Sequence, residues 1–218
     1  RYIQHGCGYE KITVIPNGIE FDHFDRIPDS CIALGLDVKT LAYAGNTDDF
    51  QGVDQLLKAF QIALQHKNNL QLMIVTQSSF DKYRPLAQRL NIWSSICLVK
   101  ANFEALPSHL AKADILLNPR TDCDGYPIKL LNYMASGKPI VTFEGSAKNI
   151  IHGINGWIVK DGDIDAFAGA ILMLLEKPIL AQSLGITAKE HSSRMHSWQA
   201  IAQKLDIVYK SLLDSWQM

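Results

Sequence analysis

Residues 115–143 read ILLNPRTDCDGYPIKLLNYMASGKPIVTF. The stretch begins and ends with short apolar runs, Ile115–Leu117 and Ile140–Phe143, which are typical of buried strands. Between these runs, Pro127 suits the first turn of a helix. A strand, a turn, a helix and a second strand in this order predict two parallel strands that are joined by a helix.

The same alternation continues on both sides of this stretch. Apolar runs rich in β-branched residues predict further strands at Leu41–Ala44, Leu70–Thr76, Ile96–Val99 and Trp157–Val159. Helical stripes begin at Val53 and at Ile164, where Asp163 can cap the helix. Runs that are apolar on both faces indicate a sheet covered on both sides. We therefore predict an α/β fold with a doubly wound, mostly parallel, Rossmann-like sheet, in which ligands lie at the carboxyl ends of the strands.

The two ends of the chain stand apart from this alternation. Ile12–Ile15 is a strand-like run, and Asn17–Gly18 favours a tight turn with positive φ. Near the other end, we expect a helix from Ile179 to about Lys189. A last helix, Trp198–Trp216, carries an apolar and aromatic stripe that needs a surface to cover.

The composition of the 218 residues excludes several classes of protein. With 47% hydrophobic residues, 20% charged residues and a formal net charge of -1, the chain is globular rather than disordered. The balanced charge lacks the basic excess that binds phosphate backbones, so we expect no nucleic-acid partner. The sequence contains no apolar stretch near the roughly 20 residues that span a bilayer.

The cysteines and histidines match no zinc-site spacing. Cys31, Cys97 and Cys123 lie in or beside apolar stretches, where a reduced thiol packs as a small hydrophobic group. The seven histidines include no His-x-His and no His-Glu-x-x-His pattern. We therefore expect a reducing, cytoplasmic location, no metal site and no cofactor.

The first candidate site is the loop Gly45–Gly52, which follows the strand ending at Ala44 and precedes the helix starting at Val53. Such a loop can present backbone N–H groups and the positive end of a helix to an anion, and its glycines allow close approach. The loop is neither the G-x-G-x-x-G dinucleotide fingerprint nor a P-loop. From these residues alone, a phosphate loop and two plain turn glycines both remain open.

The second candidate site lies in the middle of the stretch quoted first. Asp124 and Gly125 precede the helix that starts near Pro127, above the end of a predicted strand. Lys129 and Asn132 are three residues apart and share a helical face, so both can face one ligand. Taken singly, Asp124 is a helix cap and Lys129 a solvated charge. Their joint placement at a strand end favours a binding site.

Three ordered motifs carry a family resemblance. They are ITVIPNGIE at residues 12–20, YAG with QGVD within residues 43–54, and GYP through ASGKPIV within residues 125–141. In this order and spacing they resemble the carboxyl-terminal half of GT-B glycosyltransferases, and most closely the large retaining family called group 1, or family four. The resemblance covers nearly the whole chain, and PNG and ASGKP are its most specific parts.

The resemblance implies a single domain, residues 1–218, that binds a nucleotide-diphosphate sugar for transfer with retention to a saccharide, lipid or small-molecule acceptor. Residues 1–25 would lie on the interdomain side, residues 26–190 would form the Rossmann-like core, and residues 191–218 would form a C-terminal helix facing an amino-terminal domain that precedes Arg1. The whole protein could associate peripherally with a membrane through that missing half, and the isolated chain could self-associate. Such enzymes usually work without a bound metal and stabilise the leaving diphosphate with basic side chains and helix-end amides.

The acidic motif departs from the family pattern. Family members carry two glutamates that flank seven residues, and this sequence has Asp124 and Asn132 at those positions. The shorter Asp124 can still position donor hydroxyl groups, and Asn132 can still bond to a ribose.

The loop cations depart as well. Family members generally carry an Arg after the first loop glycine and a Lys before the later one, both directed at the diphosphate, where this sequence has Asn46 and Gln51. Each lost charge-assisted bond is worth roughly 1.5 to 3 kcal/mol. Arg120 and Lys129 are the evident substitutes.

The residues expected to act therefore form two groups. The catalytic group comprises Asp124, Lys129 and Arg120, and the donor-binding group comprises Gly45, Asn46, Gln51, Gly52, Gly125, Tyr126, Pro127 and Asn132. A non-catalytic nucleotide- or sugar-binding domain of the same fold is the alternative. Two other classes of the same fold are disfavoured. A phosphoacceptor receiver needs an Asp at the end of its third strand, and a nicotinamide-dependent oxidoreductase needs a glycine fingerprint; this sequence has neither.

Overall fold

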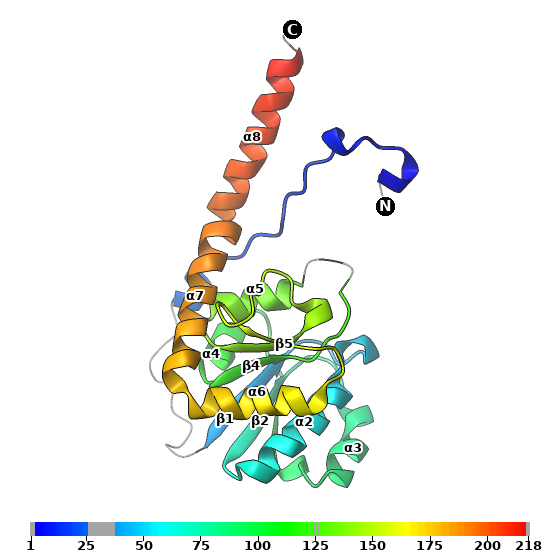
Figure 1. The fold of residues 1–218 in the computed structure, drawn as a ribbon, viewed down its shortest axis with the longest axis vertical. Coiled ribbons are helices and arrows are strands. Elements are labelled where there is room, and N and C mark those ends of the chain that lie inside the picture. Colours follow the sequence, from blue (N-terminus) through cyan, green and yellow to red (C-terminus); the bar gives the residue numbers. More distant parts are fainter. Residues whose placement is uncertain (1–2, 26–37, 124, 126, 217–218) are drawn as a thin grey trace.

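A parallel sheet forms the centre of the molecule in the computed structural model, which describes residues 3–25, 38–123, 125 and 127–216 (Figure 1). Within these residues six strands pair in the order β3-β2-β1-β4-β5-β6, and every pairing is parallel. The strands are β1 (Lys39–Ala44), β2 (Leu70–Val75), β3 (Ile96–Val99), β4 (Ile115–Asn118), β5 (Ile140–Phe143) and β6 (Trp157–Val159). The predicted doubly wound α/β fold is confirmed.

The strand order reverses between β1 and β4, which are neighbours in the sheet but far apart in sequence. The pairing of β1 with β2 continues to Ala44, opposite Val75, whereas its pairing with β4 ends at Ala42, opposite Leu116. The carboxyl ends of β1 and β4 therefore part from each other. In doubly wound sheets this switch point is where a ligand crevice forms.

Helices cover both faces of the sheet. The described α-helices are α1 (Asp22–Asp25), α2 (Val53–His66), α3 (Arg84–Arg89), α4 (Leu106–Ala111), α5 (Ile128–Ala135), α6 (Ile164–Glu176), α7 (Pro178–His196) and α8 (Trp198–Trp216). Successive strand residues alternate between two cores: Leu41 and Tyr43 pack with α2 and α6, whereas Ala42 and Ala44 pack with α4 and α5. Leu184 of α7 belongs to the first core and Ala188 to the second, so α7 crosses from one face to the other.

The helix predictions hold with one extension. The helices predicted to start at Val53 and Ile164 are α2 and α6, and the Asp163 side chain caps α6 by accepting the N–H of Ala166 at 2.9 Å. The helix expected to end near Lys189 continues to His196. A single residue, Ser197, then separates α7 from the predicted helix α8, which extends away from the sheet in Figure 1.

Two predictions for the amino-terminal segment, a strand and a turn with positive φ, were wrong. Ile12–Ile15 forms no strand, because the segment lies away from the sheet and has no neighbouring strand to pair with; Val14 is 82% exposed (Figure 1). Neither residue of Asn17–Gly18 has positive φ. Gly18 is needed for a different reason, since a Cβ there would lie 2.5 Å from the ring of Trp198.

The described residues give three facts that bear on function. Of the described helices, none combines the length and hydropathy that a membrane span requires. Cys7, Cys97 and Cys123 are free thiols, while Cys31 lies outside the described residues. No group of three His, Cys, Asp or Glu side chains within the described part of the chain is arranged to hold a metal ion.

Candidate donor-binding site

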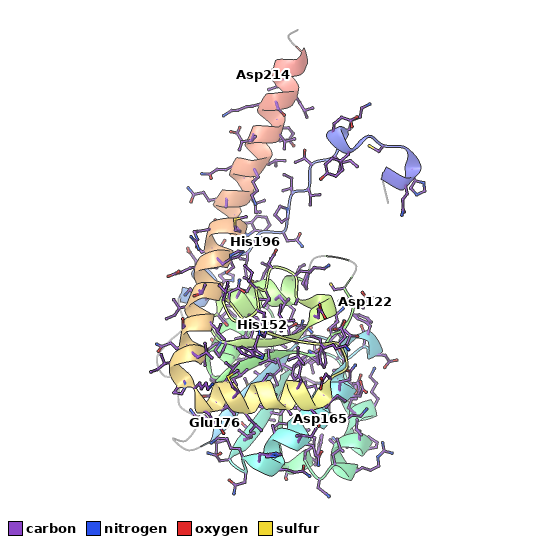
Figure 2. The ribbon with its side chains drawn as sticks, viewed as in Figure 1. Asp122, His152, Asp165, Glu176, His196 and Asp214 are labelled. Carbon is purple, nitrogen blue, oxygen red and sulfur yellow. The ribbon has the colours of Figure 1, made fainter. Side chains whose placement is uncertain are left out.

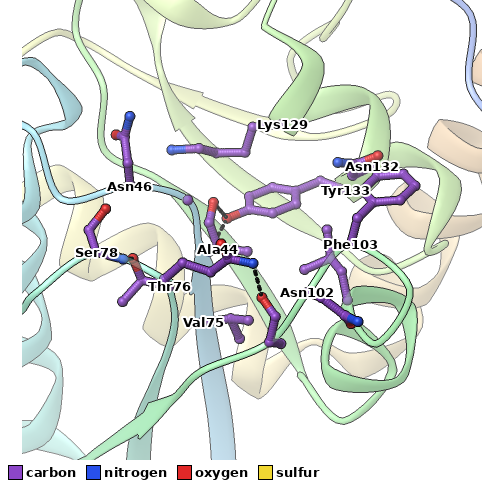
Figure 3. Close-up of a pocket in the computed structure, with 14 residues that line it drawn as sticks. Ala44, Asn46, Val75, Thr76, Ser78, Asn102, Phe103, Lys129, Asn132 and Tyr133 are labelled. Carbon is purple, nitrogen blue, oxygen red and sulfur yellow. Dashed lines mark hydrogen bonds between the residues drawn. The ribbon is translucent and has the colours of Figure 1, made fainter.

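A pocket of about 460 Å³ lies at the switch point, above the carboxyl ends of the central strands (Figure 3). Three strand-end segments and one face of α5 line it: Ala44, Gly45 and Asn46 after β1; Val75, Thr76, Gln77 and Ser78 at β2; Ala101, Asn102, Phe103 and Leu106 after β3; and Lys129, Asn132 and Tyr133 on α5. Among these lining residues Lys129 carries the only charged side chain. The pocket therefore offers polar groups and one cation to a ligand.

The Lys129 side chain crosses the mouth of this pocket from α5 to the loop after β1 (Figure 3). Its Nζ donates to Oε1 of Gln51 at 2.6 Å and to the hydroxyl of Tyr43 at 3.2 Å. The same ammonium lies 4.2 Å from the centroid of the Tyr43 ring, within cation–π range. All three contacts are with uncharged groups.

These surroundings weaken the positive charge of Lys129. Burial of the ammonium, followed by the nearby Arg120 guanidinium, lowers the pKa of Lys129 to about 7. The Cys123 thiol acts in the opposite direction. Lys129 as a whole is partly exposed and lines the pocket. An anionic ligand would favour the charged form.

Two glycines shape the loop that Lys129 reaches. Gly45 has a φ of 151°, and a Cβ at this position would lie 2.8 Å from Cε of Lys129. Gly52 has a φ of 70°, and a Cβ there would lie 2.2 Å from the carbonyl oxygen of Pro119. The absence of side chains at both positions therefore lets the loop approach α5 on one side and the segment after β4 on the other.

The buried hydroxyl of Tyr133 fills the gap where β1 and β4 part. It accepts the N–H of Ala44 at 2.7 Å and lies 3.3 Å from the carbonyl oxygen of Leu117, so it bonds with the backbone of both strands. Burial raises the pKa of Tyr133, which keeps the hydroxyl protonated. Because Lys129 and Tyr133 are one turn apart, α5 is fastened to the end of β1 at two points.

Buried side chains of β4 fix the segment that leads toward α5. The Asn118 side-chain amide donates to Oγ1 of Thr142 at 2.9 Å and to Oγ of Ser146 at 2.7 Å. The Ser146 hydroxyl in turn donates to the carbonyl oxygen of Arg120. The segment after β4 is therefore held against the neighbouring strand end, on the same edge of the sheet as the loop Gly45–Gly52.

The structure brings several of the predicted site residues together. Gly45, Asn46, Lys129 and Asn132 line the pocket, and the buried Gln51 bonds directly to Lys129. Lys129 and Asn132 do share one helical face, as their spacing predicts.

The other predicted residues lie differently. Gly52 lies behind the loop, against Pro119. Arg120 places its guanidinium carbon 4.9 Å from the centroid of the Phe50 ring, and its Nε donates to the carbonyl oxygen of Asp122. Arg120 is thus beside the pocket and not among its lining residues.

The turn before α5 is only partly described. Pro127 is the N-cap residue of α5, and Gly125 is exposed; neither lines the pocket. Asp124 and Tyr126 lie outside the described residues, so their predicted roles remain predictions.

Sequence reasoning missed two kinds of residue in or beside the pocket. The segments Thr76–Ser78 and Ala101–Phe103 follow β2 and β3, so the rule that ligands lie beyond strand ends would have found them. Tyr43 and Tyr133 lie within apolar runs and carry no such signal, because a buried tyrosine and a phenylalanine occupy the same positions in a pattern.

Comparisons with known proteins agree with this architecture. A family model described as "Glycosyl transferases group 1" matches residues 38–177. The capsular polysaccharide biosynthesis glycosyltransferase CapM of Staphylococcus aureus is 25% identical over an alignment 219 residues long, gaps included, that covers 93% of this chain and 56% of that protein. The chain spans about half the length of most of the curated relatives that it matches.

Solved structures show the same fold. Alr3699/HepE of Anabaena, in complex with UDP, superposes with a TM-score of 0.86 at 19% identity, over 96% of this chain and 60% of that one. The same protein has also been solved in complex with UDP-glucose. The C-terminal domain of a group 1 glycosyl transferase (LpcC) from Francisella tularensis superposes with a TM-score of 0.66 at 14% identity, over 84% of this chain and 95% of that domain. With the family model spanning most of its length, this chain belongs to the group 1 glycosyl transferases.

Proposed function

We propose that this chain is the donor-binding domain of a glycosyltransferase that transfers a sugar with retention from a nucleotide-diphosphate sugar to an acceptor. One observation carries the proposal: Lys129, the only charged side chain among the described residues lining the switch-point pocket, is bonded to Gln51 in the loop between β1 and α2. A pocket of about 460 Å³ with one cation at its mouth suits a ligand that is polar at one end and anionic at the other.

In the proposed binding mode, the diphosphate lies at the pocket mouth beside Lys129 and Gly45. The nucleoside extends between the segments after β2 and β3, and the ribose lies within reach of Asn132. The UDP complexes of HepE, a protein of the same fold, support a nucleotide as the ligand class. Asp124 would position hydroxyl groups of the donor sugar, on the strength of its place in the sequence motif.

Lys129 is the proposed substitute for the missing loop cations. As the bond between the sugar and the diphosphate breaks, negative charge develops on the leaving diphosphate, and an ammonium group in contact with it stabilises that charge. Lys129 already contacts Gln51, which occupies the family's lysine position. Arg120 would add positive potential from beside the pocket, since its charge reaches Lys129.

The experiment is a calorimetric titration of the 218-residue chain with UDP, UDP-glucose and uridine at pH 6.5. Lys129→Ala should weaken UDP binding by about 1.5 to 3 kcal/mol, which is about 10- to 150-fold, while uridine binding stays the same. The matched control is Lys58→Ala, which removes an exposed lysine on α2 that pairs only with Asp54 in the described contacts. The control should bind UDP like the parent.

Three outcomes would count against the proposal. A parent chain that binds none of these nucleotides, nor GDP, ADP or their sugars, would contradict the donor-binding function. Equal binding by Lys129→Ala, Arg120→Ala and the parent would show that neither cation replaces the loop cations. Binding without transfer, once the acceptor-binding half is supplied, would favour the non-catalytic alternative.

We also propose that α8 and the amino-terminal segment face an acceptor-binding domain in a longer protein. The apolar stripe of α8 is buried at Ile201 but exposed at Leu205 and Leu212, farther from the sheet. Ile207 and Leu213 are also more than half exposed. Such a surface suits burial against another domain.

A further inference from the structure

Tyr43 joins the core of the sheet to the mouth of the pocket. Its ring is fully buried among the residues that α2 and α6 cover, yet its hydroxyl reaches the loop after β1. The hydroxyl lies 2.5 Å from the carbonyl oxygen of Asn46 and 3.2 Å from Nζ of Lys129. Oε1 of Gln51 lies farther from the hydroxyl, at 3.4 Å. Both of these oxygens can only accept, so the single hydroxyl proton is donated to the nearer one, on Asn46, and the hydroxyl oxygen accepts from Lys129.

Two different parts of Tyr43 therefore contact the same ammonium. The ring face lies 4.2 Å below Nζ of Lys129, and the hydroxyl oxygen accepts a hydrogen bond from it. The open space at Gly45, where a Cβ would lie 3.0 Å from that Nζ, lets the lysine lie across the loop. Burial raises the pKa of Tyr43, so the hydroxyl stays protonated and keeps its bond to Asn46.

Among the described groups around Lys129, Tyr43 and Gln51 accept hydrogen bonds from its ammonium. Gln51 comes from the loop, Tyr43 from β1, and the Arg120 guanidinium and the Cys123 thiol from the segment after β4. Arg120 opposes the charge on Lys129, whereas an oxygen acceptor and a ring face favour it.

We propose that Tyr43 is a positioning residue that holds the Lys129 ammonium, in its charged form, over the loop Gly45–Gly52 where the donor diphosphate would lie. The inference rests on the proposed function and assigns to a core residue a part in binding the diphosphate. The nucleoside part of the ligand would be bound by the other residues of the pocket.

The test uses Tyr43→Phe, which keeps the ring and removes only the hydroxyl. UDP needs the charged form of Lys129, so its affinity is constant at low pH and falls as the pH rises through the pKa of Lys129 in the free protein, about 7. Loss of an acceptor makes the charged form less favourable and moves this fall to lower pH. We expect a shift of about one pH unit, which lowers UDP affinity about tenfold at pH 8. Uridine affinity should not change.

Two further variants separate positioning from structural damage. Tyr133→Phe removes the buried hydroxyl of a residue that lines the pocket, and the described partners of this hydroxyl are all backbone atoms. This variant should leave the pH of the fall where it is in the parent. In a Lys129→Met background, Tyr43→Phe should cause no further loss of UDP affinity, because its effect passes through the lysine.

A ligand-free measurement keeps the inference separate from the proposed function. The pKa of Lys129 can be followed by NMR of its labelled Cε in the free chain, and Tyr43→Phe should lower it by about one unit whether or not UDP binds. An unchanged lysine pKa in Tyr43→Phe, an equal shift in Tyr133→Phe, or a full Tyr43→Phe effect without Lys129 would each overturn the inference. Failure of the parent to bind any nucleotide would contradict the proposed function instead.

Discussion

The Nδ1 atom of His196 lies 3.1 Å from the carbonyl oxygen of Asn17, near the opposite end of the chain. Since a carbonyl only accepts, Nδ1 carries the proton, and Nε2 faces the side-chain amide of Asn149 at 3.1 Å as an acceptor. The N–H of Ile19 also donates to the carbonyl oxygen of His196 at 2.8 Å. His196 therefore ties the amino-terminal segment to the end of α7, as its position in Figure 2 shows.

This arrangement predicts a loss of stability in acid. Burial lowers the pKa of His196, so the neutral ring is favoured in the folded chain relative to the unfolded one. As the pH falls below the ordinary value of about 6.5, the unfolded state takes up a proton more readily, and the free energy of unfolding decreases. Urea unfolding from pH 5 to 8 should show a shallower pH dependence for His196→Gln than for the parent. The exposed His5→Gln serves as the control, and a His196→Gln profile parallel to the parent's would contradict the prediction.

Comparing alanine substitutions at Gly52 and Gly153 should separate the cost of backbone strain at positive φ from the cost of a steric contact. Gly52 and Gly153 have nearly equal φ, 70° and 73°, but only a Cβ at Gly52 meets the Pro119 carbonyl, while a Cβ at Gly153 meets nothing within 4 Å. Gly153→Ala should cost about 1 kcal/mol of unfolding free energy from backbone strain alone. Gly52→Ala should cost about 3 kcal/mol, because the contact adds an overpacking term. Equal losses in thermal or urea unfolding would mean that the loop and the Pro119 segment shift apart freely.

Lys129→Met should stabilise the fold while it weakens diphosphate binding. Methionine matches the length of the lysine stem and removes a buried charge that has only uncharged partners among its described contacts. We expect a gain of about 1 kcal/mol in unfolding free energy at pH 6. Because the pKa of Lys129 is lowered from 10.5 to about 7, the penalty is greatest below pH 7 and shrinks as the pH rises toward 10.5. A gain that does not shrink between pH 6 and pH 9 would argue against a charge effect.

The exposed stripe of α8 predicts how the isolated chain behaves. We expect it to bind an apolar dye or to self-associate in light scattering, and a longer protein that includes the proposed acceptor-binding domain to do neither. Leu205→Lys with Ile207→Lys should restore a monomer with low dye binding, since both side chains are exposed. As a control, Ile179→Lys changes an exposed residue at the start of α7 and should leave both signals high. A monomeric parent with no excess dye binding would contradict the prediction.

Much of the fold could be predicted from the sequence because its signals are local. All six strands were placed to within two residues at each end, since parallel strands covered on both faces appear as continuous apolar runs. The predicted strand-like run Ile12–Ile15, which forms no strand, shows the limit of this rule. β-branched residues favour extended backbone, but a strand also needs a neighbour, and the sequence does not say where the neighbour lies.

In the candidate site, too, some residues could be predicted from local sequence and others could not. The loop Gly45–Gly52 and the α5 face with Lys129 and Asn132 were candidates because of their places in the sequence, and the family resemblance favoured a binding site over plain turn glycines. In the structure Gly45 and Asn46 line the same pocket as Lys129 and Asn132. Gln51 links the loop directly to Lys129, and a second link, through Tyr43, was not predicted. Its hydroxyl acts across 86 residues of sequence, and the pattern around it indicates only a buried strand.

Because only Ser197 separates α7 from α8, a small change in the angle between the two helices would displace the far end of α8 by a large distance. A helix of 19 residues is about 28 Å long, so a rotation of about 10° at Ser197 moves its far end by about 5 Å, close to one helical turn. The joints that set this angle are the backbone pairing of Ile19 with Ser197 and the packing of Trp198 on Gly18. A small change of angle at these contacts would therefore displace the far end of α8 by several ångströms, together with any domain that rests on it.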